Sequence, residues 1–256
     1  MKIEVPDQLI NKLYSVRWHV AQKQAMSEDL NSSLLEYLGL VLGAKPLEPT
    51  PNQPEVGYVM PTNSASQPWL VEGRDFPIVG LEIKGIENLV QYLKDVKALE
   101  NMSWSPTAVC MHHTASPALA DRPGVGWIGQ HMMNLRNYYR NTRKFSAGPH
   151  IFTDDDSFWI FNPIQRRGVH AASFNAFAFG IEALGDFDYK DDPYSGRGKA
   201  SWDHACMAAA ALCKVFGLST AVLFHRDDKL TSKSCPGRKI KKEEAIEQIV
   251  AHLEKL

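Results

Sequence analysis

Two histidines and one cysteine in this 256-residue chain have the types and spacing of metal ligands. His112 ends the apolar segment 108–112, His225 ends the apolar segment 221–225, and Cys235 follows ten residues later. Imidazole and thiolate are preferred ligands of zinc, and three protein ligands with one open position are typical of a catalytic site. The spacing is therefore compatible with a catalytic zinc site. Two strand-end histidines and a small buried thiol would give the same pattern.

The elements that would hold these groups follow an alternation of strands and helices after Trp104. The expected strands are 108–112, 150–153, 158–161, 177–184 and 221–225. The expected helices are 125–139, a helix that Ser201 opens and Gly217 closes, and 243–256. The acidic residues 154–156 mark the turn of a hairpin. We expect an α/β domain over 101–256, with a mixed central β-sheet flanked by helices.

Residues 1–100 differ from this domain in their pattern of apolar residues and prolines. Leucine and valine at helical spacing predict two helices within 7–43, and the pattern recurs over 86–99. Seven prolines between 45 and 77 exclude a long helix or central strand there. We therefore expect a mainly helical N-terminal extension with a Pro-rich arm at about 45–77.

Charge and hydropathy exclude several classes of partner. The 28 Lys and Arg nearly balance the 29 Asp and Glu, so there is no overall basic field for nucleic acid. The apolar run 34–43 is ten residues long, well short of the roughly 20 that span a bilayer. The first ten residues lack the pattern of a signal peptide, so we expect synthesis in the cytoplasm. The cysteines do not resemble a disulfide set, and packing is expected of Cys110, Cys206 and Cys213.

Four segments, in this order, resemble motifs of the type-2 N-acetylmuramoyl-L-alanine amidases. They are AVCMHHTAS (108–116), GPHIFTDDDSFWIFNP (148–163), VHAASFNAFAFGIEALGDF (169–187) and FHRDDKLTSKSCPG (224–237). The resemblance covers roughly residues 105–250. It implies the zinc amidase fold shared by phage endolysins, muropeptide-recycling amidases and peptidoglycan recognition proteins.

The resemblance also implies roles for single residues. His112, His225 and Cys235 match the three ligands of one zinc ion. Glu182 matches a glutamate that recycling amidases use near the attacking water, and Lys233 matches a lysine placed over the scissile carbonyl. Zinc lowers the pKa of water from about 15.7 toward ~7. A carboxylate suits proton transfer, and an ammonium group suits the developing oxyanion.

Further positions match the surroundings of such a site. His150, His170 and Asn175 match positions expected to bind the substrate. His113 is expected to be structural or to lie just behind the ligands. Asp227 is expected to orient a ligand or to pair with Lys233.

The resemblance implies a peptidoglycan hydrolase of the phage endolysin kind, which acts on the cell wall after release. The bond cleaved would join N-acetylmuramic acid to the L-alanine of the stem peptide. Pro149 replaces the tyrosine that phage amidases carry, and together with Glu182 it favours the alternative of a cytosolic recycling amidase acting on muropeptides. Two further alternatives are a recognition module that binds peptidoglycan without cleaving it, and a thiol hydrolase using Cys235 and His225.

Overall fold

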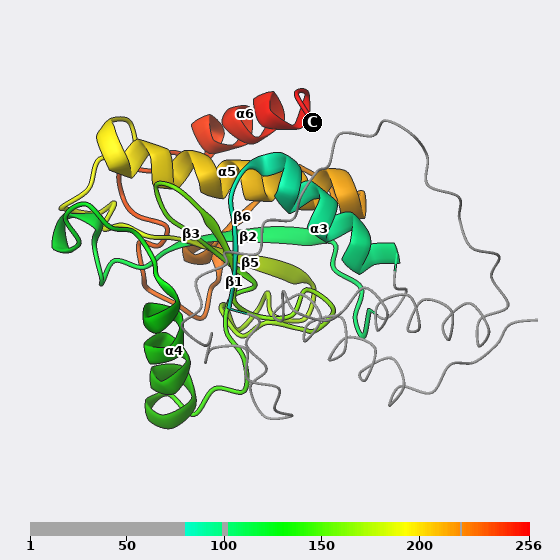
Figure 1. Ribbon diagram of the computed structural model, residues 1–256, viewed down its shortest axis with the longest axis horizontal. Coiled ribbons are helices and arrows are strands. Elements are labelled where there is room, and N and C mark those ends of the chain that lie inside the picture. The colour runs from blue at the N-terminus through cyan, green and yellow to red at the C-terminus, as the bar shows by residue number, and fades with distance from the viewer. Residues whose placement is uncertain (1–79, 99–101, 221) are drawn as a thin grey trace, which may run out of the picture. The chain divides into compact units, whose positions relative to one another are not determined.

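The computed structural model describes residues 80–98, 102–220 and 222–256 (Figure 1). The predicted helices within 7–43 and the Pro-rich arm at 45–77 lie outside the described residues. All described residues belong to one unit of the chain, Gln67–Leu256. None of the described helices combines the length and the apolar character that crossing a membrane requires.

A six-stranded mixed sheet forms the centre of this unit. Its strands are β1 (Leu81–Ile83), β2 (Ala108–His113), β3 (Ile151–Thr153), β4 (Phe158–Ile160), β5 (Ala178–Ala183) and β6 (Leu223–Phe224). Their order across the sheet is β1-β4-β3-β5-β2-β6. β1, β4 and β3 pair antiparallel, whereas β3, β5, β2 and β6 pair parallel. The predicted fold class is confirmed. β1 was not predicted, because three residues are too few for an alternating pattern.

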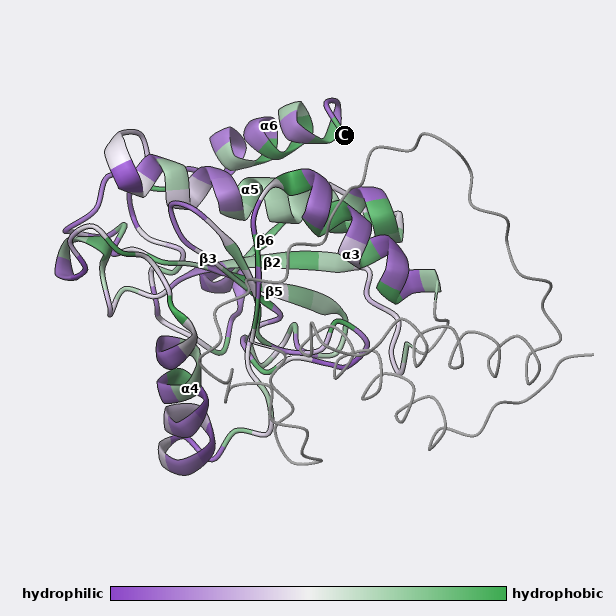
Figure 2. Ribbon diagram, viewed as in Figure 1, coloured by the Kyte–Doolittle hydropathy of each residue, from purple (hydrophilic) through white to green (hydrophobic). Residues whose placement is uncertain are grey.

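Helices cover both faces of the sheet. They are α3 (Ile86–Ala98), α4 (Gly129–Asn137), α5 (Gly196–Phe216) and α6 (Lys242–Leu253). α5 crosses the sheet with α3 and α6 beside it, and α4 stands on the other side (Figure 1). The strands β2 and β5 are hydrophobic, whereas α4 is mostly hydrophilic (Figure 2). Two apolar layers therefore enclose the sheet, and the larger one lies under α5.

Many side chains of α5 are small, which lets the helix lie close to the sheet, α3 and α6. Its run Ala208–Ala211 is fully buried. Gly217 ends the helix in the left-handed region at φ 68°, as predicted. The predicted start at Ser201 is wrong, because the helix begins at Gly196 with two glycines that weaken the helical pattern. Ser201 instead donates a hydrogen bond to the Leu184 carbonyl, at 2.8 Å, from within the helix.

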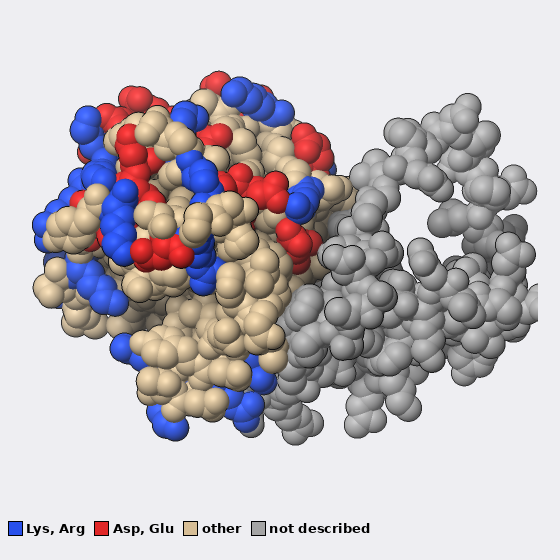
Figure 3. All heavy atoms as spheres, turned by 60° about the vertical axis from the view of Figure 1, so that its left-hand side comes forward, with Lys and Arg blue, Asp and Glu red and all other residues tan. Residues whose placement is uncertain are grey.

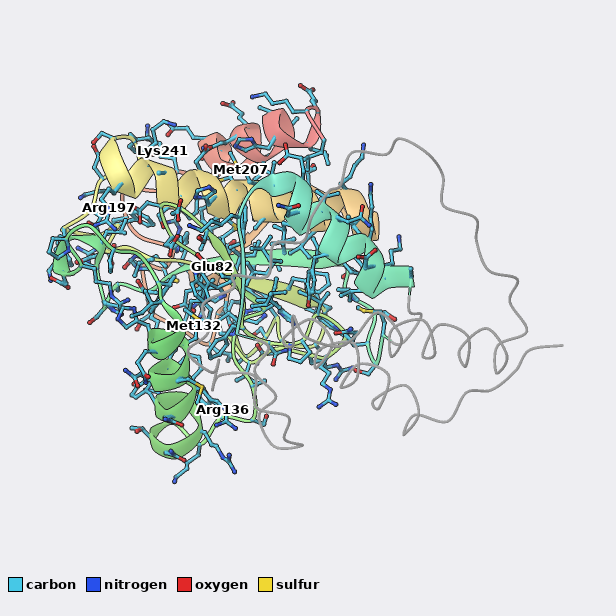
Figure 4. All side chains as sticks on the ribbon, in the orientation of Figure 1. Glu82, Met132, Arg136, Arg197, Met207 and Lys241 are labelled. Carbon is cyan, nitrogen blue, oxygen red and sulfur yellow. The ribbon has the colours of Figure 1, made fainter. Side chains whose placement is uncertain are left out.

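Tertiary hydrogen bonds delay the start of α4, which was predicted at residue 125. The backbone N–H of Trp127 donates to Asp154 Oδ2 at 2.6 Å, which holds this segment extended. Arg197, labelled in Figure 4 at the start of α5, donates to the Val125 carbonyl at 2.9 Å. Met132, also labelled there, is the fully buried contact of α4 with the sheet side. A π-helical turn, Tyr138–Thr142, continues α4.

The hairpin predicted with an acidic turn is confirmed as β3 and β4. The Asp154 carboxylate accepts hydrogen bonds from the backbone N–H groups of Asp156 at 2.9 Å and Ser157 at 2.7 Å. This pattern is the usual way in which an aspartate stabilises a turn.

The predicted domain boundary at residue 100 does not separate the elements of the sheet. β1 pairs with β4, and Leu81 lies opposite Ile160. In α3, Leu89, Leu93 and Val96 are buried in the same core as α5. The apolar face of α3 needs this partner, so residues 80–98 belong to the folding unit of the predicted catalytic domain.

Leu93→Ala is expected to destabilise the protein by about 2–5 kcal/mol, because a fully buried leucine leaves a cavity when it is truncated. Urea unfolding measures the change. Lys94→Ala, on the exposed side of the same turn, is the matched control and should change stability by less than about 0.5 kcal/mol. Equal effects of the two variants would contradict the placement of α3 in the core.

Candidate functional site

The candidate site lies where the parallel strands β2, β5 and β6 end. Parallel strands deliver their carboxyl ends to one edge of the sheet, so residues at these ends meet. His112 at the end of β2 lies opposite Glu182 of β5. His225 follows β6 directly and begins a 3₁₀ turn, His225–Asp227. The loop after this turn then brings in Cys235.

The three predicted metal ligands converge. His112 Nδ1 lies 3.1 Å from His225 Nδ1 and 3.7 Å from Cys235 Sγ. All three ligand atoms lie within 4.8 Å of one another. Ligands held about 2.0–2.3 Å from zinc in tetrahedral geometry are roughly 3.3–3.6 Å apart, so the donor set and its spacing fit one zinc ion.

Burial keeps both imidazoles neutral, as metal ligands must be. Burial lowers the pKa of His112 well below its ordinary value, and the nearby His170 and His225 lower it further. Burial also lowers the pKa of His225, and the charge of Lys233 acts in the same direction. Burial raises the pKa of the Cys235 thiol, while the hydrogen bond from the His113 backbone opposes this rise.

His113 lies next to the candidate ligands through its backbone. Its backbone N–H points at Cys235 Sγ, 3.4 Å away. Its ring turns the other way, where Nδ1 accepts a hydrogen bond from the Phe187 N–H at 3.2 Å and Nε2 lies 3.9 Å from Asp188. The two neighbouring histidines therefore face opposite sides of the strand, and only the ring of His112 reaches the candidate ligand group.

The prediction that Asp227 pairs with Lys233 is wrong. Its Oδ2 accepts hydrogen bonds from the Phe224 N–H at 2.8 Å and from Lys242 Nζ at 2.7 Å. A carboxylate at this position satisfies the N–H at the start of the turn that carries His225. Asp227 therefore stabilises the turn next to a candidate ligand and does not pair with Lys233.

A buried carboxylate that the sequence did not single out joins the two loops of the site. Asp228 accepts hydrogen bonds from the Ser173 backbone N–H at 3.0 Å and from Ser173 Oγ at 2.6 Å. The hydrogen bond from Ser173 lowers the pKa of Asp228 below its usual range. Adjacent aspartates at 227 and 228 gave no basis for choosing between them in the sequence.

His150, a predicted substrate-binding residue, has its ring occupied by contacts within the protein. It is fully buried, and its ring stacks on Trp104 with centroids 5.2 Å apart. Its Nε2 donates to the Arg166 carbonyl at 2.9 Å, and its Nδ1 accepts from the Gly180 N–H at 3.0 Å. With both nitrogens bonded to backbone, His150 is a structural residue, which does not agree with the predicted role.

The two other predicted substrate-binding residues lie on the loop before β5. His170 Nδ1 lies 3.0 Å from His112 Nε2. Asn175 Oδ1 accepts hydrogen bonds from the backbone N–H groups of His170 at 2.8 Å and Ala171 at 2.9 Å. Asn175 therefore holds the loop, and His170 contacts a candidate ligand.

A pocket opens over the ligand group. Its walls come from β2, β5, the end of α4 with its π-helical turn, and the loop 225–235. Its polar lining residues include His112, Glu182, Asp188, Lys233 and Cys235, and its aromatic ones include Trp127, Tyr138, Tyr139 and Phe145. Pro149 also lines it. The pocket therefore joins the candidate ligands to both predicted catalytic residues.

Glu182 and Lys233 form the charged part of this pocket. Desolvation at the pocket raises the pKa of Glu182 to about 8, and the charge of Lys233 opposes the rise. Among the described residues, no hydrogen-bond donor occupies the Glu182 carboxylate. Lys233 is exposed, so a cation and a proton acceptor both face the space beside the ligand group.

Tyr139 is a pocket residue that the sequence did not reveal. Burial raises its pKa well above the ordinary value, and the nearby Glu182 raises it further. In the sequence it is one of several aromatic residues at helical spacing. Its position depends on the π-helical turn after α4, for which the sequence carries no pattern.

A family model matches the part of the chain that contains the candidate site. The family model described as N-acetylmuramoyl-L-alanine amidase matches residues 102–238. The search of curated proteins finds no match.

Solved structures similar to the chain include amidases from bacteria and an insect protein. An endolysin N-acetylmuramoyl-L-alanine amidase from Clostridium intestinale is 21% identical, with 57% of this chain and 85% of that chain covered and a TM-score of 0.45. A mutant endolysin from Bacillus subtilis is 22% identical, with coverages of 58% and 88% and a TM-score of 0.44. PGRP-LB from Drosophila is 20% identical, with coverages of 56% and 81% and a TM-score of 0.43.

The family model spans more than half of the chain and contains β2, β5, β6 and the candidate ligands. The resemblance inferred from the four sequence segments is thereby confirmed. The chain belongs to the N-acetylmuramoyl-L-alanine amidase family.

Proposed function

We propose that this protein is a zinc-dependent peptidoglycan amidase that hydrolyses the bond between N-acetylmuramic acid and L-alanine. The observation that carries the proposal is the convergence of His112, His225 and Cys235 in one pocket with Glu182 and Lys233. The first three would hold one zinc ion. When bound, zinc supplies a Lewis acid that polarises a carbonyl group and favours the ionisation of water.

Glu182 is the proposed proton-transfer group. Water attacks the carbonyl carbon of the lactyl group, and Glu182 accepts the proton that the water loses. When the tetrahedral intermediate collapses, the C–N bond breaks and the same proton passes to the leaving amine of L-alanine. A pKa raised to about 8 suits a group that must both take and return a proton near neutral pH.

Lys233 is the proposed stabiliser of the oxyanion. Its ammonium group lies near enough to lower the pKa values of Glu182, His112 and His225, which supports a positive charge beside the proposed reaction centre. An ammonium group donates hydrogen bonds and accepts none, so it favours the negatively charged intermediate over the neutral substrate.

A basic segment that contributes Arg143 to the pocket supports an anionic substrate. Between residues 122 and 153 the chain has five Arg and Lys and no Asp or Glu. Arg143 from this segment lines the pocket. At the lower end of the face drawn in Figure 3, where α4 lies, Lys and Arg are visible without Asp or Glu. Stem peptides carry carboxylates, which such a basic segment attracts.

The proposed biological role is that of an endolysin-like enzyme acting on intact cell wall, with the residues before β1 as an accessory region. The combination of Pro149 and Glu182 favours a second candidate, an amidase that recycles soluble muropeptides. The rates on intact sacculi and on soluble anhydro-muropeptides distinguish these two roles. A higher kcat/KM on the soluble substrates would support the second.

Purified protein is expected to contain one equivalent of zinc, measured by elemental analysis. His225→Ala and Cys235→Ala should lose it, because each removes one of three protein ligands. Free zinc at 1,000 times its Kd should raise the free energy of unfolding by about 4 kcal/mol. Cys213→Ala, at a buried thiol on α5, is the control and should keep full loading. A parent protein without zinc would support a recognition module and contradict the proposal.

The protein treated with a chelator should lose stability as pH rises from 4.5 to 8, because folding raises the Glu182 pKa from 4.5 to about 8. Across this window, a carboxyl group whose pKa is raised by folding lowers the free energy of unfolding by about 1.4 kcal/mol for each pH unit. Glu182→Gln should therefore be more stable than the parent at pH 8 by a few kcal/mol and similar to it at pH 5. Urea unfolding at both pH values tests this.

Glu247→Gln, at an exposed position of α6, is the control for that series and should follow the parent at both pH values. If Glu182→Gln also follows the parent, Glu182 is solvated and the proposed environment of the base is wrong.

Digestion of purified sacculi should release stem peptides with a free L-alanine amine and leave a free lactyl carboxylate on the glycan, identified by mass spectrometry. Lys233→Ala should lower kcat on the order of 100-fold, as expected from the loss of one oxyanion donor. Lys229→Ala, exposed on the same loop, should retain full activity. New termini at any other bond would refute the proposed specificity. Full activity after metal removal would favour the thiol hydrolase.

A further inference from the structure

His112 is contacted on both of its ring nitrogens. Its Nδ1 faces His225 Nδ1 at 3.1 Å and Cys235 Sγ at 3.7 Å, on the side of the candidate ligand group. Its Nε2 lies 3.0 Å from His170 Nδ1 on the opposite side. A neutral imidazole has one N–H and one bare nitrogen, so the two contacts of His112 depend on which nitrogen carries the proton.

The next contact along this chain of hydrogen bonds decides the position of that proton. His170 Nε2 lies 2.9 Å from the Ala178 carbonyl oxygen, which can only accept. His170 must therefore donate from Nε2, which leaves its Nδ1 bare as an acceptor. His112 must then donate from Nε2, and its bare Nδ1 points toward His225 and Cys235.

The position of His170 is fixed from several sides. Asn175 accepts the hydrogen bond of the His170 backbone N–H at 2.8 Å. The imidazole lies so close to Gly180 of β5 that a Cβ there would come within 2.6 Å of ring atoms Cγ and Cδ2. Ser173, on the same loop, is bonded to Asp228 in the loop that leads to Cys235. The loop that carries His170 is therefore held against β5 and against the loop that leads to Cys235.

We propose that His170 is a positioning residue that fixes His112 in the Nε2–H tautomer and so presents Nδ1 to zinc. Partners behind a metal ligand orient the ring and raise its basicity, and their loss typically weakens metal binding 10–100-fold. The inference rests on the zinc site of the proposed function and is independent of the substrate. It gives His170 a task toward His112 in place of the predicted contact with substrate.

A rival arrangement uses the same atoms. The ligand atoms of Cys110, His112 and His170 also lie within 4.8 Å of one another. A metal ion there would replace the proton between His112 Nε2 and His170 Nδ1, so the two arrangements exclude each other. Cys235 lines the pocket over the candidate ligands, whereas Cys110 is fully buried and does not line it, which favours the site with Cys235.

The test compares two variants of the full-length protein by zinc affinity, measured in competition with a chromophoric chelator. His170→Phe keeps an aromatic ring against Gly180 but has no acceptor, and it should weaken zinc binding 10–100-fold. His170→Asn can place a carboxamide oxygen near the position of Nδ1, and it should bind zinc within about threefold of the parent. Unfolding of each protein in chelator shows that the fold is kept.

Two further measurements separate the proposal from its rival. Cys110→Ala should bind one equivalent of zinc with unchanged affinity. Imidazole ¹⁵N chemical shifts of the parent should show the Nε2–H tautomer for both His112 and His170, and His170→Phe should lose the single tautomer of His112.

Three results would overturn the inference: unchanged affinity in His170→Phe, a second equivalent of metal that Cys110→Ala loses, or an Nδ1–H tautomer for His112 in the parent. If the parent binds no zinc, the proposed metal site itself fails. If the parent binds zinc and His170→Phe binds it equally well, only the positioning role fails.

Discussion

The parallel pairing of β2 with β5 is the constraint on which the rest of the site depends. It sets His112 opposite Glu182 in register, so a ligand and a proton acceptor share one edge of the sheet. A slip of one residue would turn every side chain of β2 to the other face and exchange His112 with His113. The buried apolar residues of β2 and β5 under α5 prevent that slip. The hydrophobic core therefore determines which histidine can meet a metal.

Much of this arrangement was accessible from the sequence, because the buried strands are continuous apolar runs that end in polar residues. The runs before His112 and His225 predicted their strands, and the segment around Glu182 predicted β5. Those three residues and Cys235 were identified together only through their resemblance to a family, since spacing alone also fitted buried strand-end residues. Two features were not predicted. β1 has only three residues, and the first turn of α5 contains glycines, which weaken the helical pattern.

The roles of the supporting residues could not be predicted, because they depend on hydrogen bonds between segments distant in sequence. His150 and His170 both lie in segments that resemble motifs of the family, yet His150 is buried between Trp104 and the backbone, and His170 contacts His112. Asp227 and Asp228 are neighbours with separate partners, Lys242 and Ser173. The residue types predicted that these groups belong to the site, but the role of each follows only from its hydrogen-bond partners.

The pairing of β1 with β4 has a consequence for any shortened form of the protein. The family match begins at residue 102, after β1 and α3. A fragment cut at that point would leave the hydrogen-bonding edge of β4 open and uncover the apolar surface on which Leu89, Leu93 and Val96 pack. Open strand edges beside apolar surface promote association between chains. The segment from residue 80 to 98 thus covers a strand edge and an apolar surface of this unit, a task separate from catalysis.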